Sequence, residues 1–228
     1  VTREFIAELR KIATEHDVIL IFDEVVTGFR VTPGGAQQHY GITPDMCSLA
    51  KILSGGLPGG AVTGRADIFE LLDFEKAAEK GFEKIGHQGT FNANPMSAAA
   101  GIAALELIAK GDVCTKASAT AANIRTRLNE VFEEEQVPWA CYGDHSGFFL
   151  FTNPGNDDIT PSTFDPYAQP SEVLKRASPG DLVTRLRLGI MTNGGVVSAV
   201  HTENDVDKTA EAVRQTVRML KAEGEVTG

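Results

Sequence analysis

The feature that most constrains how this chain can fold is an unbroken apolar run, residues 18–22, followed directly by Asp23 and Glu24. Apolar residues that do not alternate with polar ones are typical of a strand buried on both faces of a parallel sheet. In open α/β sheets, ligands bind at the carboxyl ends of the strands. The run therefore predicts a fully buried parallel strand that presents Asp23 at the edge of a site.

A second apolar run, residues 46–50, ends at Lys51 and precedes a glycine-rich loop over 54–60. If both runs are strands, Lys51 and Asp23 both lie at strand ends. A lysine among apolar residues and glycines loses solvation, so its pKa falls and its amine becomes available as a nucleophile that forms Schiff bases. The alternative is an ordinary solvated surface lysine.

The carboxylate of Asp23 needs a partner at the end of a buried strand, and a protonated pyridine nitrogen is one partner that uses it. The alternatives are a helix cap or a structural ion pair with Arg30. For Glu24 we expect a structural role, as a carboxylate that bonds to nearby loop amides. Gly89 and Thr90 offer a backbone amide and a hydroxyl suited to phosphate, although a two-residue pattern of this kind is usually a turn.

The flanking segments alternate between helix and strand. Apolar residues recur at helical spacing over 3–15, and this helix leads directly into the first strand. A helix that enters a strand so directly is half of an α/β repeat, so we expect an earlier strand that this sequence does not contain. Residues 61–63 can return as a strand and residues 66–80 are expected to form an amphipathic helix. Asn94 and Pro95 then read as the N-cap and first residue of a long helix rich in small side chains.

The pattern changes near residue 112. Apolar residues at helical spacing occupy 124–132 and the final segment 206–220, and the β-prone run 147–151 lies between them. Helix, strand and helix in this order predict a small C-terminal α+β domain over 112–228. Residues 1–111 then form the later part of a larger domain.

Charge and cysteine content narrow the partners. The net charge of -10 disfavours a broad surface for nucleic acid or anionic membranes and favours small-molecule partners. No apolar run approaches the roughly 18 residues that a membrane span needs. The three cysteines, Cys47, Cys114 and Cys141, are far apart and odd in number, which argues against a disulfide framework and fits a reducing compartment. We therefore expect a cytoplasmic protein.

Three motifs in order give the chain a resemblance to a known family. They are residues 21–30, 49–60 and 89–95, and together they resemble the class III pyridoxal-phosphate-dependent aminotransferases. Within that class the sequence is most similar to the glutamate-1-semialdehyde aminomutase group, in which the spacing of Asp23 and Lys51 is also found. The resemblance implies an α/β fold of the fold type I transferases, with part of the large mixed-sheet domain and a smaller C-terminal α+β domain.

The resemblance also implies roles for individual residues. Lys51 would form the Schiff base with pyridoxal 5'-phosphate and then move the proton between substrate and cofactor. Asp23 would bond the pyridinium nitrogen, and Val25, two positions on and hence on the same strand face, would pack under the ring. Gly89 and Thr90 would bind the cofactor phosphate, with Thr90 acting in the adjacent subunit, so the family implies a homodimer with a shared active site.

The resemblance corresponds only to about the later half of a family member. The N-terminal half, which supplies a phosphate loop, a ring-stacking aromatic residue and most contacts to the substrate carboxylate, is missing from the sequence and would be needed. The loop at 191–197, which precedes His201, is shorter than the corresponding loop of the aminomutases. Residues 91–94 are similar to the same segment of transaminases that act on β- or ω-amino acids. The predicted function is therefore amino transfer between an amino acid and a keto acid or aldehyde, with glutamate-1-semialdehyde 2,1-aminomutase, an enzyme of tetrapyrrole precursor synthesis, as the alternative.

Two interpretations from other functional classes stay open. Ser48 and Lys51 satisfy the S-x-x-K pattern of serine acyl enzymes, although the accompanying K-T-G is absent. The chain could also be a non-catalytic half or a pseudoenzyme subunit. The presence of both Lys51 and Asp23 argues against a decayed site.

Overall fold

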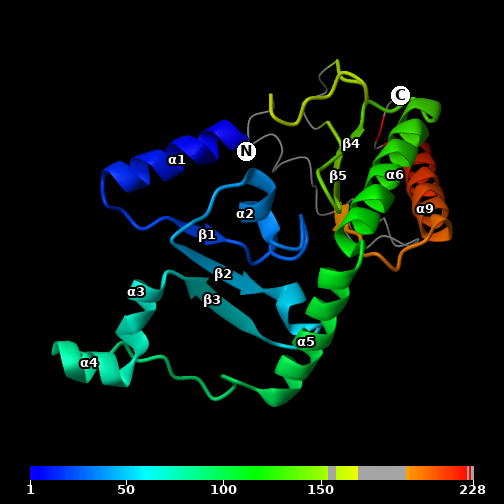
Figure 1. Cartoon of the computed structure of the whole chain (residues 1–228). Coiled ribbons are helices and arrows are strands. Elements are labelled where there is room, and N and C mark those ends of the chain that lie inside the picture. The colour runs from blue at the N-terminus through cyan, green and yellow to red at the C-terminus, as the bar shows by residue number, and fades with distance from the viewer. Residues whose placement is uncertain (154–157, 169–193, 225, 227–228) are drawn as a thin grey trace. The chain divides into compact units, whose positions relative to one another are not determined.

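The computed structural model describes residues 1–153, 158–168, 194–224 and 226. The chain forms two compact units, Val1–Asp112 and Val113–Gly228, and among the described residues each contains its own three-stranded sheet (Figure 1). Helices accompany both sheets, so each unit has mixed α and β character. None of the helices in these described ranges is long and apolar enough to cross a membrane.

The first unit is built on a mixed sheet with the strand order β1-β2-β3. Its strands are β1 (Ile21–Asp23), β2 (Met46–Ala50) and β3 (Gly60–Gly64). β1 and β2 are parallel, as the first apolar run predicts, and Asp23 lies opposite Ser48 in their register. β3 returns antiparallel to β2. The parallel pair places the carboxyl ends of β1 and β2 at the same edge of the sheet.

The prediction that residues 18–22 form a fully buried strand is wrong, because the strand is shorter and its side chains are more exposed than predicted. β1 begins only at Ile21, and the side chains of Val18, Ile19 and Ile21 are 58%, 50% and 58% exposed. The physical reason is that β1 is the edge strand, so no further strand of the described chain lies beside it. An apolar surface is therefore left open around the strand that ends in Asp23.

The remaining elements of the first unit are short helices followed by one long helix. Their bounds are α1 (Arg3–Glu15), α2 (Gly35–Tyr40), η1 (Lys51–Ser54), α3 (Ala66–Phe69), η2 (Glu70–Leu72), α4 (Phe74–Lys80) and α5 (Pro95–Lys110). The prediction of one helix over 66–80 is wrong, because Asp73 accepts two backbone N–H groups and starts a new helix, α4. α5 begins as predicted, with Asn94 as its N-cap and Pro95 at its first position.

Asp45 joins three elements of the first unit. Its carboxylate accepts a hydrogen bond from the backbone N–H of Leu20 at 2.8 Å and forms ion pairs with Arg10 of α1 at 2.7 Å and with Arg65, which follows β3, at 3.1 Å. The bond from Leu20, followed by the one from Arg10, lowers the pKa of Asp45 far below its usual range. A carboxylate this little exposed is stable in a fold only when it is paired in this way.

The second unit packs two long helices on an antiparallel sheet with the order β4-β5-β6. The elements are α6 (Val113–Glu134), β4 (Ala140–Tyr142), β5 (Gly147–Phe151), β6 (Gly194–Val196) and α9 (Glu203–Ala222). The predicted helices at 124–132 and 206–220 and the predicted strand at 147–151 are confirmed. Their apolar side chains form one continuous core, which includes Ile124, Leu128, Phe132, Leu150, Val213 and Val217.

Hydrogen bonds between neighbouring residues define the start of α9. Thr202 and Asp205 form a capping box, in which the backbone N–H of Thr202 donates to the Asp205 carboxylate at 2.8 Å. This bond lowers the pKa of Asp205. Of the loop predicted to be shortened at 191–197, residues 191–193 lie outside the described residues and the next three form β6.

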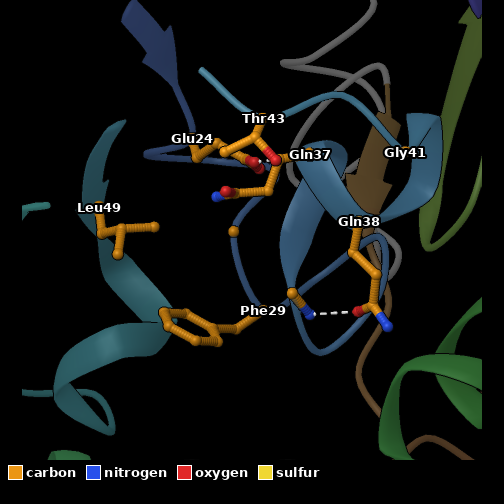
Figure 2. A pocket seen from close by; sticks show the side chains of 9 residues that line it. Glu24, Phe29, Gln37, Gln38, Gly41, Thr43 and Leu49 are labelled. Atoms are coloured by element: carbon orange, nitrogen blue, oxygen red, sulfur yellow. Dashed lines mark hydrogen bonds between the residues drawn. The ribbon is translucent and has the colours of Figure 1, made fainter. Parts of the chain in front are cut away.

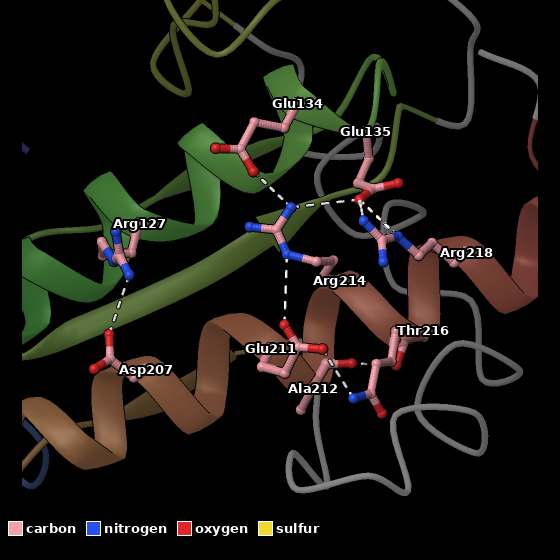
Figure 3. A network of polar contacts seen from close by, with 10 residues as sticks. Arg127, Glu134, Glu135, Asp207, Glu211, Ala212, Arg214, Thr216 and Arg218 are labelled. Atoms are coloured by element: carbon pink, nitrogen blue, oxygen red, sulfur yellow. Dashed lines mark hydrogen bonds and ion pairs between the residues drawn. The ribbon is translucent and has the colours of Figure 1, made fainter.

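Ion pairs join α6 and α9 along their exposed sides (Figure 3). Arg214 lies 2.5 Å from Glu134 and 3.4 Å from Glu135, and Arg218 lies 2.7 Å from Glu135. Arg218 is also the main cause of the lowered pKa of Glu135. Ion pairs with exposed members contribute little stability one by one, so the apolar core between the two helices is the main source of their stability.

Candidate active site

Asp23 ends β1 with an exposed carboxylate. Its Oδ1 accepts hydrogen bonds from the hydroxyl of Ser48 at 2.9 Å and from the backbone N–H of Val25 at 3.1 Å. The bond from Val25 is the largest cause of a lowered pKa at Asp23, followed by Ser48 and, more weakly, by the positive charge of Lys51. The described residues offer Oδ2 no hydrogen bond and Asp23 no ion pair with Arg30. Asp23 is thus an ionised acceptor with one oxygen available to a ligand.

Lys51 lies at the same sheet edge, as the first residue after β2. It opens η1 with a backbone φ of +53°, in the left-handed region that side chains other than glycine seldom occupy. Asp23 lies opposite Ser48 in the register of β1 and β2, and Lys51 follows three residues after Ser48, so the two predicted residues lie at the same edge of the sheet. The predicted loss of solvation is wrong for this chain, because the Lys51 side chain is exposed. None of the described residues covers the Lys51 side chain.

Ser48 is a partner of Asp23, a role that the sequence did not predict. The parallel register places it opposite Asp23, and its hydroxyl donates to the Asp23 carboxylate. Ser48 lies in β2 and Lys51 lies after its end, whereas residues three apart face the same side only in a helix. This arrangement argues against the serine acyl-enzyme interpretation. The signal that could have identified Ser48 is its place in the strand next to β1.

Val25 does not lie where the sequence predicts. β1 ends at Asp23, and residues 25–30 form turns, so Val25 is not on the same strand face as Asp23. The cause is local: Asp23 accepts the Val25 N–H and so turns the chain immediately after the strand. Val25 therefore contributes its backbone to the group, and a role of its side chain under a ring stays a prediction.

Glu24 has the predicted structural role (Figure 2). The residue is 1% exposed, and its carboxylate accepts hydrogen bonds from Thr27 Oγ1 at 2.7 Å and from the backbone N–H groups of Ala36 at 2.7 Å and Gln37 at 2.9 Å. Glu24 thereby fixes the loop that follows β1 to the start of α2. A pocket lies beside it, lined by Glu24, Gly28, Phe29, Gly34, Gln37, Gln38, Gly41, Thr43 and Leu49.

Gly89 and Thr90 lie in the segment between α4 and α5. Both are exposed, and the carbonyl of Gly89 accepts the backbone N–H of Asn92 at 3.0 Å in a turn. Within the described part of the chain, no hydrogen bond joins either residue to Asp23 or Lys51. Their predicted contact with a phosphate, made by Thr90 in an adjacent subunit, stays a prediction.

Comparison with known proteins gives a consistent picture. The sequence model of the aminotransferase class-III family matches residues 1–143. A glutamate-1-semialdehyde 2,1-aminomutase of Methanosarcina acetivorans is 37% identical over 218 residues, which are 91% of this chain and 47% of that protein. The chain spans about half the length of the curated relatives it matches.

Solved structures match the fold. An omega-transaminase from Sphaerobacter thermophilus has a TM-score of 0.73 and 26% identity, covering 95% of this chain and 48% of that one. A transaminase with pyridoxal phosphate bound has a TM-score of 0.76 and 25% identity, covering 98% of this chain and 49% of that one. These matches confirm the predicted α/β transferase fold. Because the family model spans more than half of the sequence, the chain belongs to the class III aminotransferases, a family of enzymes whose cofactor is pyridoxal phosphate.

Proposed function

We propose that this chain provides the lysine and the ring-nitrogen carboxylate of an enzyme that transfers an amino group between an amino acid and a keto acid or aldehyde. One observation supports this most directly: Asp23 and Lys51 lie together at the carboxyl edge of two parallel strands. Ligands bind at this edge in open α/β sheets. The proposal extends to the assembled enzyme, of which this chain corresponds to about half.

The residues present fit pyridoxal phosphate at two points. Asp23 is ionised and keeps Oδ2 open, which suits a protonated pyridine nitrogen. Lys51 presents an exposed amine beside it, which suits the cofactor aldehyde. Gly89 and Thr90 would add a backbone N–H and a hydroxyl for the phosphate. We infer that the remaining contacts come from outside the described residues.

The chain's own groups then have distinct tasks. When bound, the cofactor supplies a conjugated ring that stabilises negative charge at the substrate carbon. Asp23 would keep the ring nitrogen protonated, because a carboxylate with a lowered pKa stays ionised at neutral pH and favours a positive partner. Lys51 Nζ would hold the cofactor through its aldehyde, and as a free amine Lys51 would take a proton from one carbon of the substrate and deliver it to another.

Borohydride reduction in the presence of pyridoxal phosphate tests the lysine assignment. We expect the reduced label on the peptide that contains Lys51 and its loss in Lys51→Ala. Lys110→Ala is the matched control, because Lys110 is a surface lysine that pairs with Glu106 on α5. Label spread evenly over the lysines, or retained at full yield in Lys51→Ala, would contradict the proposal.

A second candidate function is the aminomutase, which the 37% identity to the Methanosarcina acetivorans protein favours. A mutase keeps its intermediate until the amino group has been returned to another carbon, whereas a transaminase releases a keto product. The loaded enzyme should therefore be mixed with α-, β- and ω-amino acids without any keto acid. Discharge of the bound cofactor by simple amino acids favours the transaminase, and turnover of glutamate-1-semialdehyde alone favours the mutase.

The open apolar surface around α1 and β1 supports a further part of the proposal. Phe5, Ile12, Ile19 and Ile21 are between 45% and 58% exposed, and exposed apolar side chains that lie together usually contact another polypeptide. We propose that it packs against the region equivalent to the other half of the relatives. Charged variants at Ile12 should abolish co-purification of this chain with such a half, while Lys11→Glu, on the solvated side of α1, should not.

We also propose a homodimer whose active sites are shared. If Thr90 acts in the adjacent subunit, Lys51→Ala on one subunit and Thr90→Ala on the other damage the same site of the dimer. Hybrid dimers that carry one variant on each subunit then contain one intact site, although each parent is inactive. Failure of the hybrid to exceed both parents would place Thr90 in its own subunit's site or outside it.

A further inference from the structure

The backbone of Lys51 has an unusual conformation that its surroundings must maintain. Its φ of +53° lies in the left-handed region, which costs a residue with a side chain roughly 1–2 kcal/mol. Such a conformation persists only where neighbouring structure imposes it. The side chain of Lys51 is exposed and cannot do this. The constraint therefore has to act on the backbone of η1, which Lys51 begins.

Among the elements of the described chain, α5 makes the most extensive contact with η1, which also touches β2 and β3 (Figure 1). Gly101, the buried glycine of α5, lies so close that a Cβ built on it would be 2.5 Å from the carbonyl oxygen of Leu53. Gly55 follows η1 as its C-cap with a φ of +60°, and a Cβ on it would be 2.3 Å from the carbonyl oxygen of Ala100. At both points backbone meets backbone, so no flexible side chain can move aside.

The loop after η1 is attached to the same helix. Ser97 of α5 donates its hydroxyl to the carbonyl of Pro58 at 2.7 Å. Ser54, the last residue of η1, is 5% exposed, and a Cβ on Gly59 would lie 2.0 Å from its hydroxyl oxygen. The turn that begins at Lys51 is thus enclosed between the end of β2 on one side and α5 on the other.

We propose that Gly101 and Gly55 are positioning residues for Lys51: the close contacts of Gly101 with Leu53 of η1 and of Gly55 with Ala100 of α5 keep the Lys51 backbone left-handed and so direct its amine toward the Asp23 edge of the sheet. This inference rests on the function proposed for Lys51. It gives a structural task to the small residues of α5, which allow close approach of the turn that bears the lysine. Larger side chains there displace the lysine without touching any ligand.

Gly101→Ala is the most informative variant. The added methyl group is expected to stabilise the helix but to displace η1, so a purely helical role and a positioning role predict different results. Alanine favours a helix interior by up to about 1 kcal/mol over glycine, so a purely helical role predicts a slightly more stable protein with unchanged chemistry. The proposal predicts that the new Cβ pushes η1 away. A misplacement of about 1 Å can cost up to about 100-fold in rate, so we expect reductive labelling of Lys51 by pyridoxal phosphate to slow by between about 10-fold and 100-fold.

The readout that does not depend on the cofactor is amide hydrogen exchange, followed by mass spectrometry. In Gly101→Ala we expect faster exchange in the peptide over 51–55 and unchanged exchange in α6 and α9. Ala99→Val is the matched control, because Ala99 is an exposed residue of the same helix, and it should alter neither readout. Ser97→Ala removes one hydrogen bond without adding volume, and a smaller slowing of the labelling is expected from it.

The outcomes separate this inference from the proposed function. If the unaltered chain is not labelled at Lys51, the function proposed for this residue is wrong. If it is labelled, and Gly101→Ala matches it both in labelling rate and in exchange over 51–55, the positioning role is wrong. If Gly101→Ala unfolds the chain, the comparison passes to Ser97→Ala, whose labelling rate must fall relative to Ala99→Val for the proposal to stand.

Discussion

The two units of the chain are stabilised by different physical means. In the second unit Leu128, Phe132 and Val217 are fully buried in a continuous apolar core. In the first unit, the described side chain that is both large and almost fully buried is a carboxylate, Glu24 at 1% exposure, while Phe5 on α1 is 56% exposed. The second unit is stabilised mainly by burial of apolar side chains. The first unit relies more on hydrogen bonds, ion pairs and close backbone contacts.

This difference suits the task proposed for each unit. Apolar burial is strong but has no preferred direction, whereas hydrogen bonds and backbone contacts act only at defined distances and angles. The unit that positions Asp23 and Lys51 uses the directional interactions, and it leaves its apolar surface open for another polypeptide. The following variants test whether this division is real.

The largest effect is expected from removing a buried ring in the second unit. Phe132→Ala should lower the free energy of unfolding by about 3–5 kcal/mol, because it deletes buried apolar contacts and leaves a cavity. The matched variant Phe5→Ala, in the first unit, should cost about 0.5 kcal/mol or less because its ring is exposed. Urea unfolding followed by fluorescence of Trp139, which lies 5.7 Å from Phe132 between ring centres, gives the first value, and calorimetry gives the second. Equal losses would contradict the division.

The next effect is expected at the buried carboxylate of the first unit. Glu24→Gln replaces one accepting oxygen by an NH₂ group, so at least one of its three donors loses its acceptor. A buried group left unpaired costs about 1–3 kcal/mol. We expect faster hydrogen exchange at the amides of Ala36 and Gln37. Glu8→Gln, a surface change on α1, should leave exchange at those two amides as it is.

Acid sensitivity should be the third and smaller effect. The pKa of Asp45 is lowered in the folded chain, so its contribution to stability is complete above its unfolded pKa of about 3.9 and is lost as the pH falls through the folded value. Asp45→Asn should therefore be less stable than the unaltered chain at neutral pH and should change less between about pH 4 and pH 2. Calorimetry over this range measures both. If the stability of Asp45→Asn falls as steeply with decreasing pH as that of the unaltered chain, other carboxylates cause the acid sensitivity. Asp207→Asn, an exposed carboxylate of the second unit, is the control.

The smallest effect is expected at Ser48. Removing its hydroxyl in Ser48→Ala takes one hydrogen bond from Asp23 and should raise the Asp23 pKa toward its ordinary value, while the backbone bond from Val25 keeps part of the shift. Carboxyl ¹³C NMR titration measures this change. The thermal midpoint of unfolding should not change, because the Ser48 hydroxyl and the Asp23 carboxylate lie at the carboxyl ends of the strands and outside the apolar core. Thr63→Ala on β3 is the control, and an unchanged Asp23 pKa in Ser48→Ala would remove Ser48 from the site.

The sequence by itself determined the elements whose cause is local. The apolar periodicity of α6 and α9, the capping box of Thr202 and Asp205, and the start of α5 at Asn94 and Pro95 depend on residues within a few positions of each other. The three ordered motifs likewise identified the family. Asp23 and Lys51 could be paired because each follows an apolar run, and parallel strands align such ends.

Only the tertiary structure decided the features that depend on neighbours far along the chain. Burial of β1 depends on what lies beside it, so an apolar run could not reveal that Ile19 and Ile21 are exposed. Ser48 became the partner of Asp23 through strand register, and Gly101 became the neighbour of η1 through packing. Residue types alone could not reveal either contact, because neither has a fixed spacing in sequence.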